Sequence, residues 1–142
     1  MQKQTGFTLI ELIIVIAIIA ILVAVVMLNV PQYIAKGKNS AITGDMLSIL
    51  VSSASWNDNH YTYIGFSADT TFSTPKNQIV SYLPSGGNTI VEIETADAFC
   101  ACTPLLDVAG SIGQTFCVDS NLNKKQTGTT CAAECSAAGI CQ

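Results

Sequence analysis

The sequence has no arginine, only one histidine, and no cysteine before residue 100. Its six lysines are outnumbered by ten carboxylates, so the net charge is −4. Proteins that bind nucleic acid electrostatically normally have a basic stripe and use arginine for bidentate phosphate contacts, so no direct nucleic-acid binding is expected. The single histidine, His60, has no nucleophile motif beside it and is expected in a surface turn. The sequence therefore predicts no catalytic residues and no enzyme activity.

Apolar residues are concentrated in one N-terminal block. Residues 12–28 are uninterruptedly apolar. Residues 7–30, at about 1.5 Å each, are long enough as a helix to cross a hydrocarbon core of roughly 30 Å. A secretory signal peptide or a simple single-pass anchor would show similar hydropathy. A signal peptide, however, has a shorter apolar region of about 7–15 residues followed by a small-residue cleavage site.

Glu11 is an acid at the start of this apolar block. A carboxylate in a membrane helix is costly and usually has a partner and a function. If the bond between Gly6 and Phe7 were cut, Phe7 would gain an α-ammonium group. A neighbouring subunit could then use that ammonium to neutralise Glu11 where water is scarce. Charge pairing would couple cleavage to assembly.

Residues 3–12 read K-Q-T-G-F-T-L-I-E-L, which resembles the processing motif of type IV prepilins and of type II secretion pseudopilins. The resemblance implies a leader at residues 1–6, which a prepilin peptidase removes after Gly6 before N-methylating Phe7. It makes Glu11 the assembly carboxylate. It also implies a single-pass precursor in the inner membrane, surrounded by lipid, which an inner-membrane assembly platform builds into a filament of pilin subunits outside the cell. Such filaments serve adhesion, twitching motility, DNA uptake or secretion.

The helix is expected to continue past Pro31 as an amphipathic half over residues 31–57. The residues expected on the packed face recur there at the i, i+3, i+4, i+7 spacing of a helix, namely Ile34, Ala41, Ile42, Met46, Ile49, Leu50, Ser53 and Trp56. Turn-favouring residues at 57–60 predict the end of the helix near Trp56. Pro31, Gly37 and Gly44 weaken a helix. They mark a segment that could stretch when subunits pack, as in the filaments that this chain resembles, although tolerated glycine is the simpler account.

Residues 58–142 are expected to form the head. The aromatic residues between Tyr61 and Phe72 lie in a Ser/Thr-rich stretch without clear periodicity, which predicts a long connecting loop that packs them on the head. A turn is expected at residues 85–88. Apolar and polar residues alternate over 89–95, which predicts a strand, and 98–105 and 114–119 are candidates for a second and a third strand, with Ala96 and Asp97 turning the first pair. The predicted fold is α+β, a long hydrophobic helix packed on a small antiparallel sheet with a stapled C-terminal loop, as in pilins.

All six cysteines lie in the last third of the chain: Cys100, Cys102, Cys117, Cys131, Cys135 and Cys141. An even count in a small domain behind a membrane-targeting segment predicts disulfides made in an oxidising compartment, so the head should face outward. Cys100 and Cys102 point to the same face of one strand and are poorly placed to pair with each other. Bonds between the first three and the last three cysteines are plausible, but fifteen connectivities remain open.

Two sequence patterns superficially imitate metal sites. The cysteine spacing lacks the C-x2-C pairs of structural zinc folds, and no histidine lies nearby. Asp119, Asn121 and Asn123 imitate the start of a calcium loop, but Lys124 and Thr130 stand where glycine and glutamate are needed, so a turn is expected. We therefore expect no cofactor.

Major pseudopilins typically carry a calcium loop and few cysteines, so the resemblance favours a pilin. A pseudopilin and a membrane-anchored extracellular binding module remain alternatives.

Overall fold

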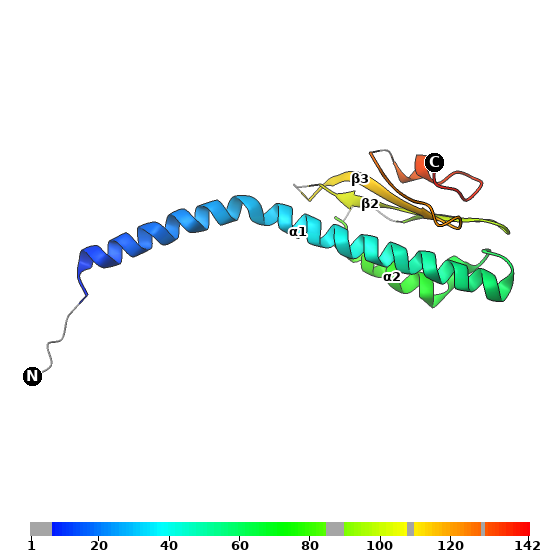
Figure 1. Ribbon diagram of the computed structural model, residues 1–142, viewed down its shortest axis with the longest axis horizontal. Helices are drawn as coiled ribbons and strands as arrows, with labels where there is room; N and C mark the ends of the chain where they lie inside the picture. The colour runs from blue at the N-terminus through cyan, green and yellow to red at the C-terminus, as the bar shows by residue number, and fades with distance from the viewer. Residues whose placement is uncertain (1–6, 85–89, 108–109, 129) are drawn as a thin grey trace, which may run out of the picture.

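The computed structural model describes residues 7–84, 90–107, 110–128 and 130–142. One long helix extends from a small α+β head, as predicted (Figure 1). The elements along the chain are α1 (Leu9–His60), the 3₁₀ helix η1 (Phe66–Ala68), α2 (Thr70–Tyr82), β1 (Val91–Glu94), β2 (Phe99–Leu106), β3 (Ile112–Asp119), β4 (Lys124–Thr127) and α3 (Cys131–Glu134). The turn predicted at residues 85–88, the start of the first predicted strand at Thr89, and Gly6 lie outside the described residues.

Helix α1 continues through Pro31 and ends at His60, later than predicted. Figure 1 shows that it bends between its N-terminal and C-terminal halves, and a proline inside a helix is a common cause of such a bend. The turn-favouring residues at 57–60 are helical because their side chains bond the preceding turn. Asn59 Nδ2 donates to Ser55 O at 2.7 Å, and His60 Nδ1 lies 3.0 Å from Trp56 O. Tyr61, in the left-handed conformation at φ 57°, ends the helix.

The sheet is an antiparallel meander in the order β1-β2-β3-β4. The predicted turn at Ala96 and Asp97 is confirmed, since Thr95 N donates to Ala98 O across it at 2.9 Å. Strand β4 was missed because Lys124–Thr127 is short and polar and shows no apolar alternation. It lies at the edge of the sheet, where lysines are common because they discourage further strand pairing.

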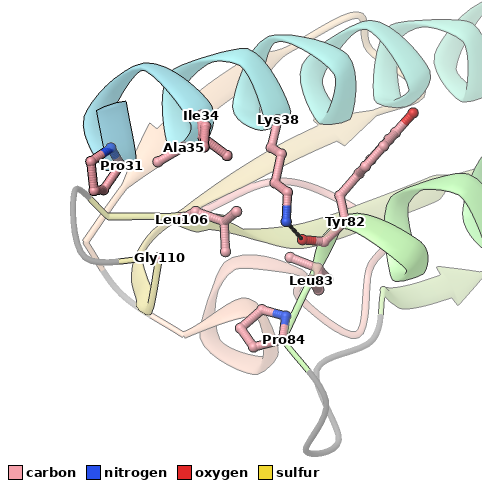
Figure 2. A pocket seen from close by; sticks show the side chains of 9 residues that line it. All are labelled: Pro31, Ile34, Ala35, Lys38, Tyr82, Leu83, Pro84, Leu106 and Gly110. Carbon is pink, nitrogen blue, oxygen red and sulfur yellow. Dashed lines mark hydrogen bonds between the residues drawn. The ribbon is translucent and has the colours of Figure 1, made fainter. Parts of the chain in front are cut away.

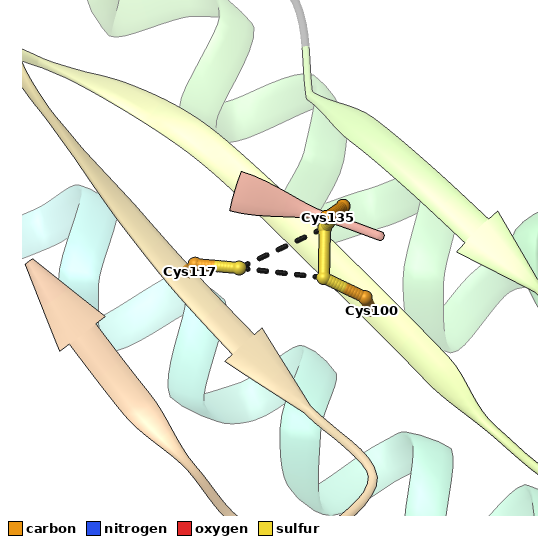
Figure 3. Close-up of side chains that lie close together, drawn as sticks. All are labelled: Cys100, Cys117 and Cys135. Atoms are coloured by element: carbon orange, nitrogen blue, oxygen red, sulfur yellow. Dashed lines mark hydrogen bonds between the residues drawn. A yellow bond between two sulfur atoms is a disulfide. The ribbon is translucent and has the colours of Figure 1, made fainter. Parts of the chain in front are cut away.

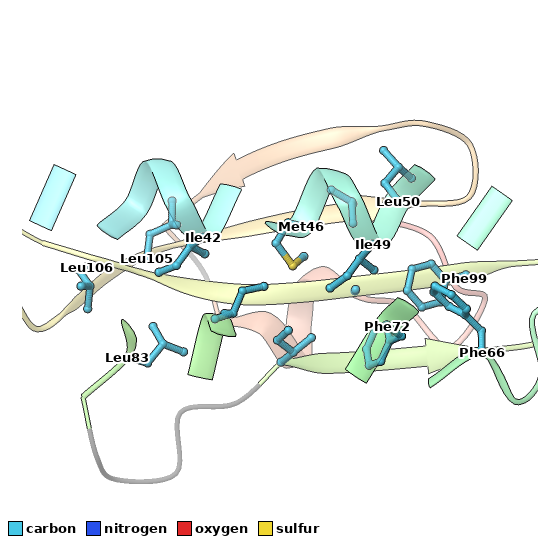
Figure 4. Close-up of a cluster of buried hydrophobic side chains, with 14 of the residues drawn as sticks. Ile42, Met46, Ile49, Leu50, Phe66, Phe72, Leu83, Phe99, Leu105 and Leu106 are labelled. Carbon is cyan, nitrogen blue, oxygen red and sulfur yellow. The ribbon is translucent and has the colours of Figure 1, made fainter. Parts of the chain in front are cut away.

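Strand β2 is buried on both faces, because the head has three layers. Figure 1 shows α1 and α2 beneath the sheet and the C-terminal tail on its other side. Phe99, Ala101 and Leu105 contribute to the core against the helices, whereas Cys100 and Cys102 face the tail. Figure 4 shows Ile42, Met46 and Ile49 of α1 packed in this core. The amphipathic half of α1 is thus covered, as its periodicity predicts.

The predicted loop between α1 and the sheet is wrong in its largest part, because it contains η1 and α2. The Asp69 side chain accepts a hydrogen bond from Thr71 N at 2.8 Å and caps α2. Phe66 and Phe72 pack edge-to-face with centroids 5.4 Å apart, and each packs similarly against Phe99 of β2. Tyr61 does not join this cluster, since it is 89% exposed. Tertiary contacts of Phe66 and Phe72, rather than helix propensity, stabilise this segment.

Two polar side chains fasten distant segments to the head. Asn39 of α1 donates from Nδ2 to Leu106 O at 2.8 Å and accepts from Leu106 N at 2.8 Å, so it pairs the end of β2 as another strand would. Glu94 of β1 accepts from the backbone N–H groups of Gly65 and Ser67, which orders the connection that leads into α2. Neither contact follows from the sequence pattern.

Candidate functional site

The N-terminal end of α1 is closed by a reciprocal hydrogen-bond pair between Thr8 and Glu11. Glu11 N donates to Thr8 Oγ1 at 3.4 Å, and Glu11 Oε2 accepts from Thr8 N at 2.8 Å and from Thr8 Oγ1 at 2.7 Å. This capping box satisfies backbone donors at the helix start. Glu11, which the sequence predicts as the assembly carboxylate, acts as a cap within its own chain. Phe7 lies beside it and is exposed.

The N-terminal half of α1 is apolar on every side and extends away from the head, as Figure 1 shows. All of its residues from Leu9 to Ile34 are exposed. By length and composition, α1 is the one helix among the described residues that could cross a membrane, with a mean hydropathy of 3.4 over its most apolar 18-residue window. A helix that is apolar all round requires lipid or other protein as its surroundings. These features and the position of the helix fit a membrane-anchored precursor.

The segment from Pro31 to Gly44 is helical throughout. A Cβ atom added at Gly37 or Gly44 would meet nothing within 4 Å, so packing within one subunit does not require glycine at either position. Just before Pro31, Asn29 Nδ2 donates to Val25 O at 3.0 Å and so bonds back to its own helix. The predicted loosening of this segment remains a proposal.

The six cysteines form three disulfides, and each joins a strand cysteine to a tail cysteine: Cys100–Cys135, Cys102–Cys131 and Cys117–Cys141. The Cα–Cα distances of 5.3 to 6.1 Å suit disulfide bonds. The tail is thereby fixed to the face of the sheet that the helices leave uncovered. This choice among the fifteen connectivities required the structure, because the register that places Cys102 opposite Cys117 is not visible in the sequence.

Sulfur atoms of Cys100, Cys117 and Cys135 lie within 4.8 Å of one another, a compact cluster shown in Figure 3. Free thiolates at this spacing could bind a metal ion. Cys100 is bonded to Cys135, however, and Cys117 to Cys141, so none of the three has a thiolate to offer. The arrangement is a stack of two neighbouring disulfides.

Asp119 lies at the end of β3 and is fully buried. Its carboxylate accepts hydrogen bonds from Asn121 N at 2.9 Å, Asn123 N at 3.1 Å, Asn123 Nδ2 at 3.0 Å and Cys141 N at 2.9 Å. Four N–H donors occupy the oxygens that a calcium ion would need. Asp119 therefore shapes the β3–β4 turn, as predicted, and also fastens the C-terminal tail, which was not predicted.

His60 lies at the opposite end of α1 from Glu11 and stacks on Trp56 with ring centroids 3.8 Å apart. It is exposed, and it is helical rather than in the predicted turn. Asp69 lies nearby, and hydrogen bonds from the Thr71 side chain and backbone, with a smaller contribution from His60, lower the pKa of its carboxyl. These contacts close the end of α1 and cap α2.

The comparisons with known proteins agree with the N-terminal geometry. No curated protein and no solved structure gives a significant match to the chain. One family model does match, that of the prokaryotic N-terminal methylation motif, over residues 1–27. The matched region contains Phe7, the Thr8–Glu11 capping box and most of the exposed apolar helix. This motif points to a structural subunit rather than an enzyme. The chain therefore carries, at its N-terminus, the signature of type IV prepilins and pseudopilins.

Proposed function

We propose that this chain is the precursor of a subunit of a type IV pilus-like extracellular filament. A prepilin peptidase cuts between Gly6 and Phe7 and N-methylates Phe7, and an inner-membrane assembly platform adds the subunit to the filament. The observation that carries the proposal is the methylation motif at residues 1–27, which overlaps an apolar helix exposed on every side. The filament then replaces lipid as the cover of that helix.

Glu11 directs assembly in this proposal. In the single chain its carboxylate bonds only Thr8, which leaves its charge without a cation among the described residues. The α-ammonium of Phe7 in a neighbouring subunit supplies one after cleavage. A charge buried in a filament core without such a partner would be strongly disfavoured, so the pair selects the register of neighbouring helices.

The disulfide-fixed tail favours a pilin over a type II secretion pseudopilin, the runner-up. A calcium-binding loop is typical of major pseudopilins, and here N–H groups occupy the Asp119 carboxylate instead. Adhesion, motility, DNA uptake and secretion are all uses open to such a filament. A membrane-anchored extracellular binding module would share the anchor but would keep its leader and stay monomeric.

The N-terminal mass and sequence, measured in the cell envelope and in sheared extracellular material, test the proposal. We expect a chain that begins at a singly methylated Phe7 and is present in the sheared fraction.

Glu11→Gln and Thr8→Ala form a matched pair of variants. Glutamine at residue 11 can still cap the helix, whereas alanine at residue 8 cannot. Glu11→Gln should abolish sheared filaments, and Thr8→Ala should retain most of them. A chain that still begins at Met1, or one cut beyond Val30 and soluble, would contradict the proposal.

A further inference from the structure

An apolar groove of about 290 Å³ opens where the head meets the membrane-spanning half of α1. One face of α1, the C-terminal end of α2 and the β2–β3 hairpin surround it, as Figure 2 shows. Its walls are mainly apolar, with Ile34 and Ala35 on the helix facing Leu83, Pro84 and Leu106. The groove thus continues the apolar surface of α1 into the base of the head.

The depth of the groove relative to a bilayer follows from the helix. Ile34 and Lys38 lie about 6 and 12 Å beyond Val30 along an axis that rises about 1.5 Å per residue. The headgroup layer extends roughly 5–8 Å beyond the hydrocarbon core on each side. If residues 7–30 span the core, Lys38 lies just beyond the headgroup layer, from where its long side chain can reach back toward the lipid phosphates, and Ile34 lies within that layer. Tyr33 is exposed at the same level, where tyrosine is enriched in membrane proteins.

Among the described residues, Lys38 is the one cation that lines the groove. Its Nζ donates to Tyr82 O at 3.3 Å, and its other two N–H donors make no hydrogen bond to the residues that the structure describes. Among the described residues it forms no ion pair, since the one salt bridge there joins Lys76 to Glu92. The carboxylate of the adjoining hairpin, Asp107, accepts hydrogen bonds from Ser111 N at 2.9 Å and Ser111 Oγ at 3.0 Å. The groove therefore combines apolar walls with an exposed ammonium group.

We propose that this groove binds an anionic phospholipid of the membrane in which the precursor is anchored. Lys38 contacts the lipid phosphate, and Ile34, Leu83 and Leu106 contact the beginning of an acyl chain. Because the walls are apolar, a lipid fits better than a free phosphate. The inference rests on the proposed membrane-anchored precursor and adds a ligand that the subunit exchanges for contacts with its neighbours during assembly.

Fluorescence quenching by brominated lipids tests the proposal with the full chain in vesicles. Trp56 is the only tryptophan, so Tyr82→Trp in a Trp56→Phe background places one reporter at the groove. At equal mole fraction in phosphatidylcholine vesicles, brominated phosphatidylglycerol should quench about five times more strongly than brominated phosphatidylcholine, the enrichment expected from one lysine near a membrane surface. Lys38→Gln should bring this ratio to about one, whereas Lys124→Gln on β4, with the same loss of charge, should leave it unchanged. Mass mapping of the three disulfides checks that each variant is folded.

Several results would overturn the proposal. Equal quenching by the two lipids, or a ratio that survives Lys38→Gln, removes the anionic lipid as the ligand. Loss of the ratio when soluble glycerol phosphate competes would identify a free phosphate ligand instead. If the reporter emission changes with the protein-to-lipid ratio and not with the lipid charge, the groove binds a second copy of the chain instead of a lipid. Quenching is measured on the unassembled precursor, whereas the filament assay uses processed chains. A negative quenching result would therefore contradict lipid binding without contradicting filament assembly.

Discussion

The two halves of α1 have the same backbone conformation but opposite surroundings. From Leu9 to Ile34 every residue is exposed, whereas Ala35, Ile42, Met46, Ile49, Leu50 and Ser53 in the second half are buried. The first half is apolar all round, so a small head packed on one side would leave its other sides uncovered. The second has an apolar stripe and a polar remainder, which suits a helix packed on one side. One helix therefore serves as an anchor at one end and as part of a core at the other.

The sharpest test of this contrast substitutes the same residue type in each half. Ile49 is fully buried and Ile19 is 52% exposed. Ile49→Ala should lower the free energy of unfolding of the head by about 2–5 kcal/mol, because it leaves a cavity in the core. Ile19→Ala should change it by less than about 0.5 kcal/mol. Urea titration of Trp56 fluorescence, with the full chain in mild detergent, measures both. Equal effects would show that the first half also packs on the head.

Removing one disulfide should affect the head, which packs on the second half of α1, but not the first half of α1. Cys102→Ser with Cys131→Ser opens a loop with a sequence separation of 29 residues and should destabilise the head by roughly 2–4 kcal/mol. Helical content and bilayer insertion of the first half should not change, because the tail does not touch it. Urea titration of Trp56 fluorescence measures the stability of the head, and circular dichroism in vesicles measures the helical content. Ala133→Ser, an exposed change in the same tail, is the control and should have little effect.

The smallest expected effect concerns two carboxyl groups of the head whose pKa values shift in opposite directions. Hydrogen bonds from Thr71 lower the pKa of Asp69, so the stabilisation it gives is present above its unfolded pKa of about 3.9 and is lost as the pH falls through its folded pKa. Burial raises the pKa of Asp45, so its contribution is present at low pH and is lost as the pH rises through its folded pKa.

Melting curves between about pH 3 and pH 6 can separate these two contributions. Asp69→Asn keeps a capping oxygen and should reduce the acid-side loss of stability. Asp45→Asn should raise the melting temperature slightly at neutral pH and leave it unchanged in acid. An unchanged acid-side slope in Asp69→Asn would mean that other carboxyl groups control the acid transition.

Sequence patterns predict some helices and strands of this protein and miss others, for physical reasons. The sequence predicts the first strand from its alternation and β2 and β3 from short runs of apolar residues, whereas it gives no signal for β4 because Lys124–Thr127 is polar and exposed. The sequence pattern predicts a loop where α2 lies, because Phe72 and Ile79 are its only large buried apolar side chains and it includes Pro75. At the N-terminus, the position of Glu11 was clear from the sequence, but its capping bonds with Thr8 were not.

The sequence by itself determined the local features of this protein: the apolar run, the acid at its start, the amphipathic second half, and an even set of cysteines behind a membrane segment. Each of these is a matter of residue type and spacing along the chain. Only the tertiary structure decided which cysteines pair, that Asn39 binds the end of β2, and that Lys38 stands beside an apolar groove. Those contacts join residues that are tens of positions apart, and they depend on strand register and helix docking, which local periodicity does not encode.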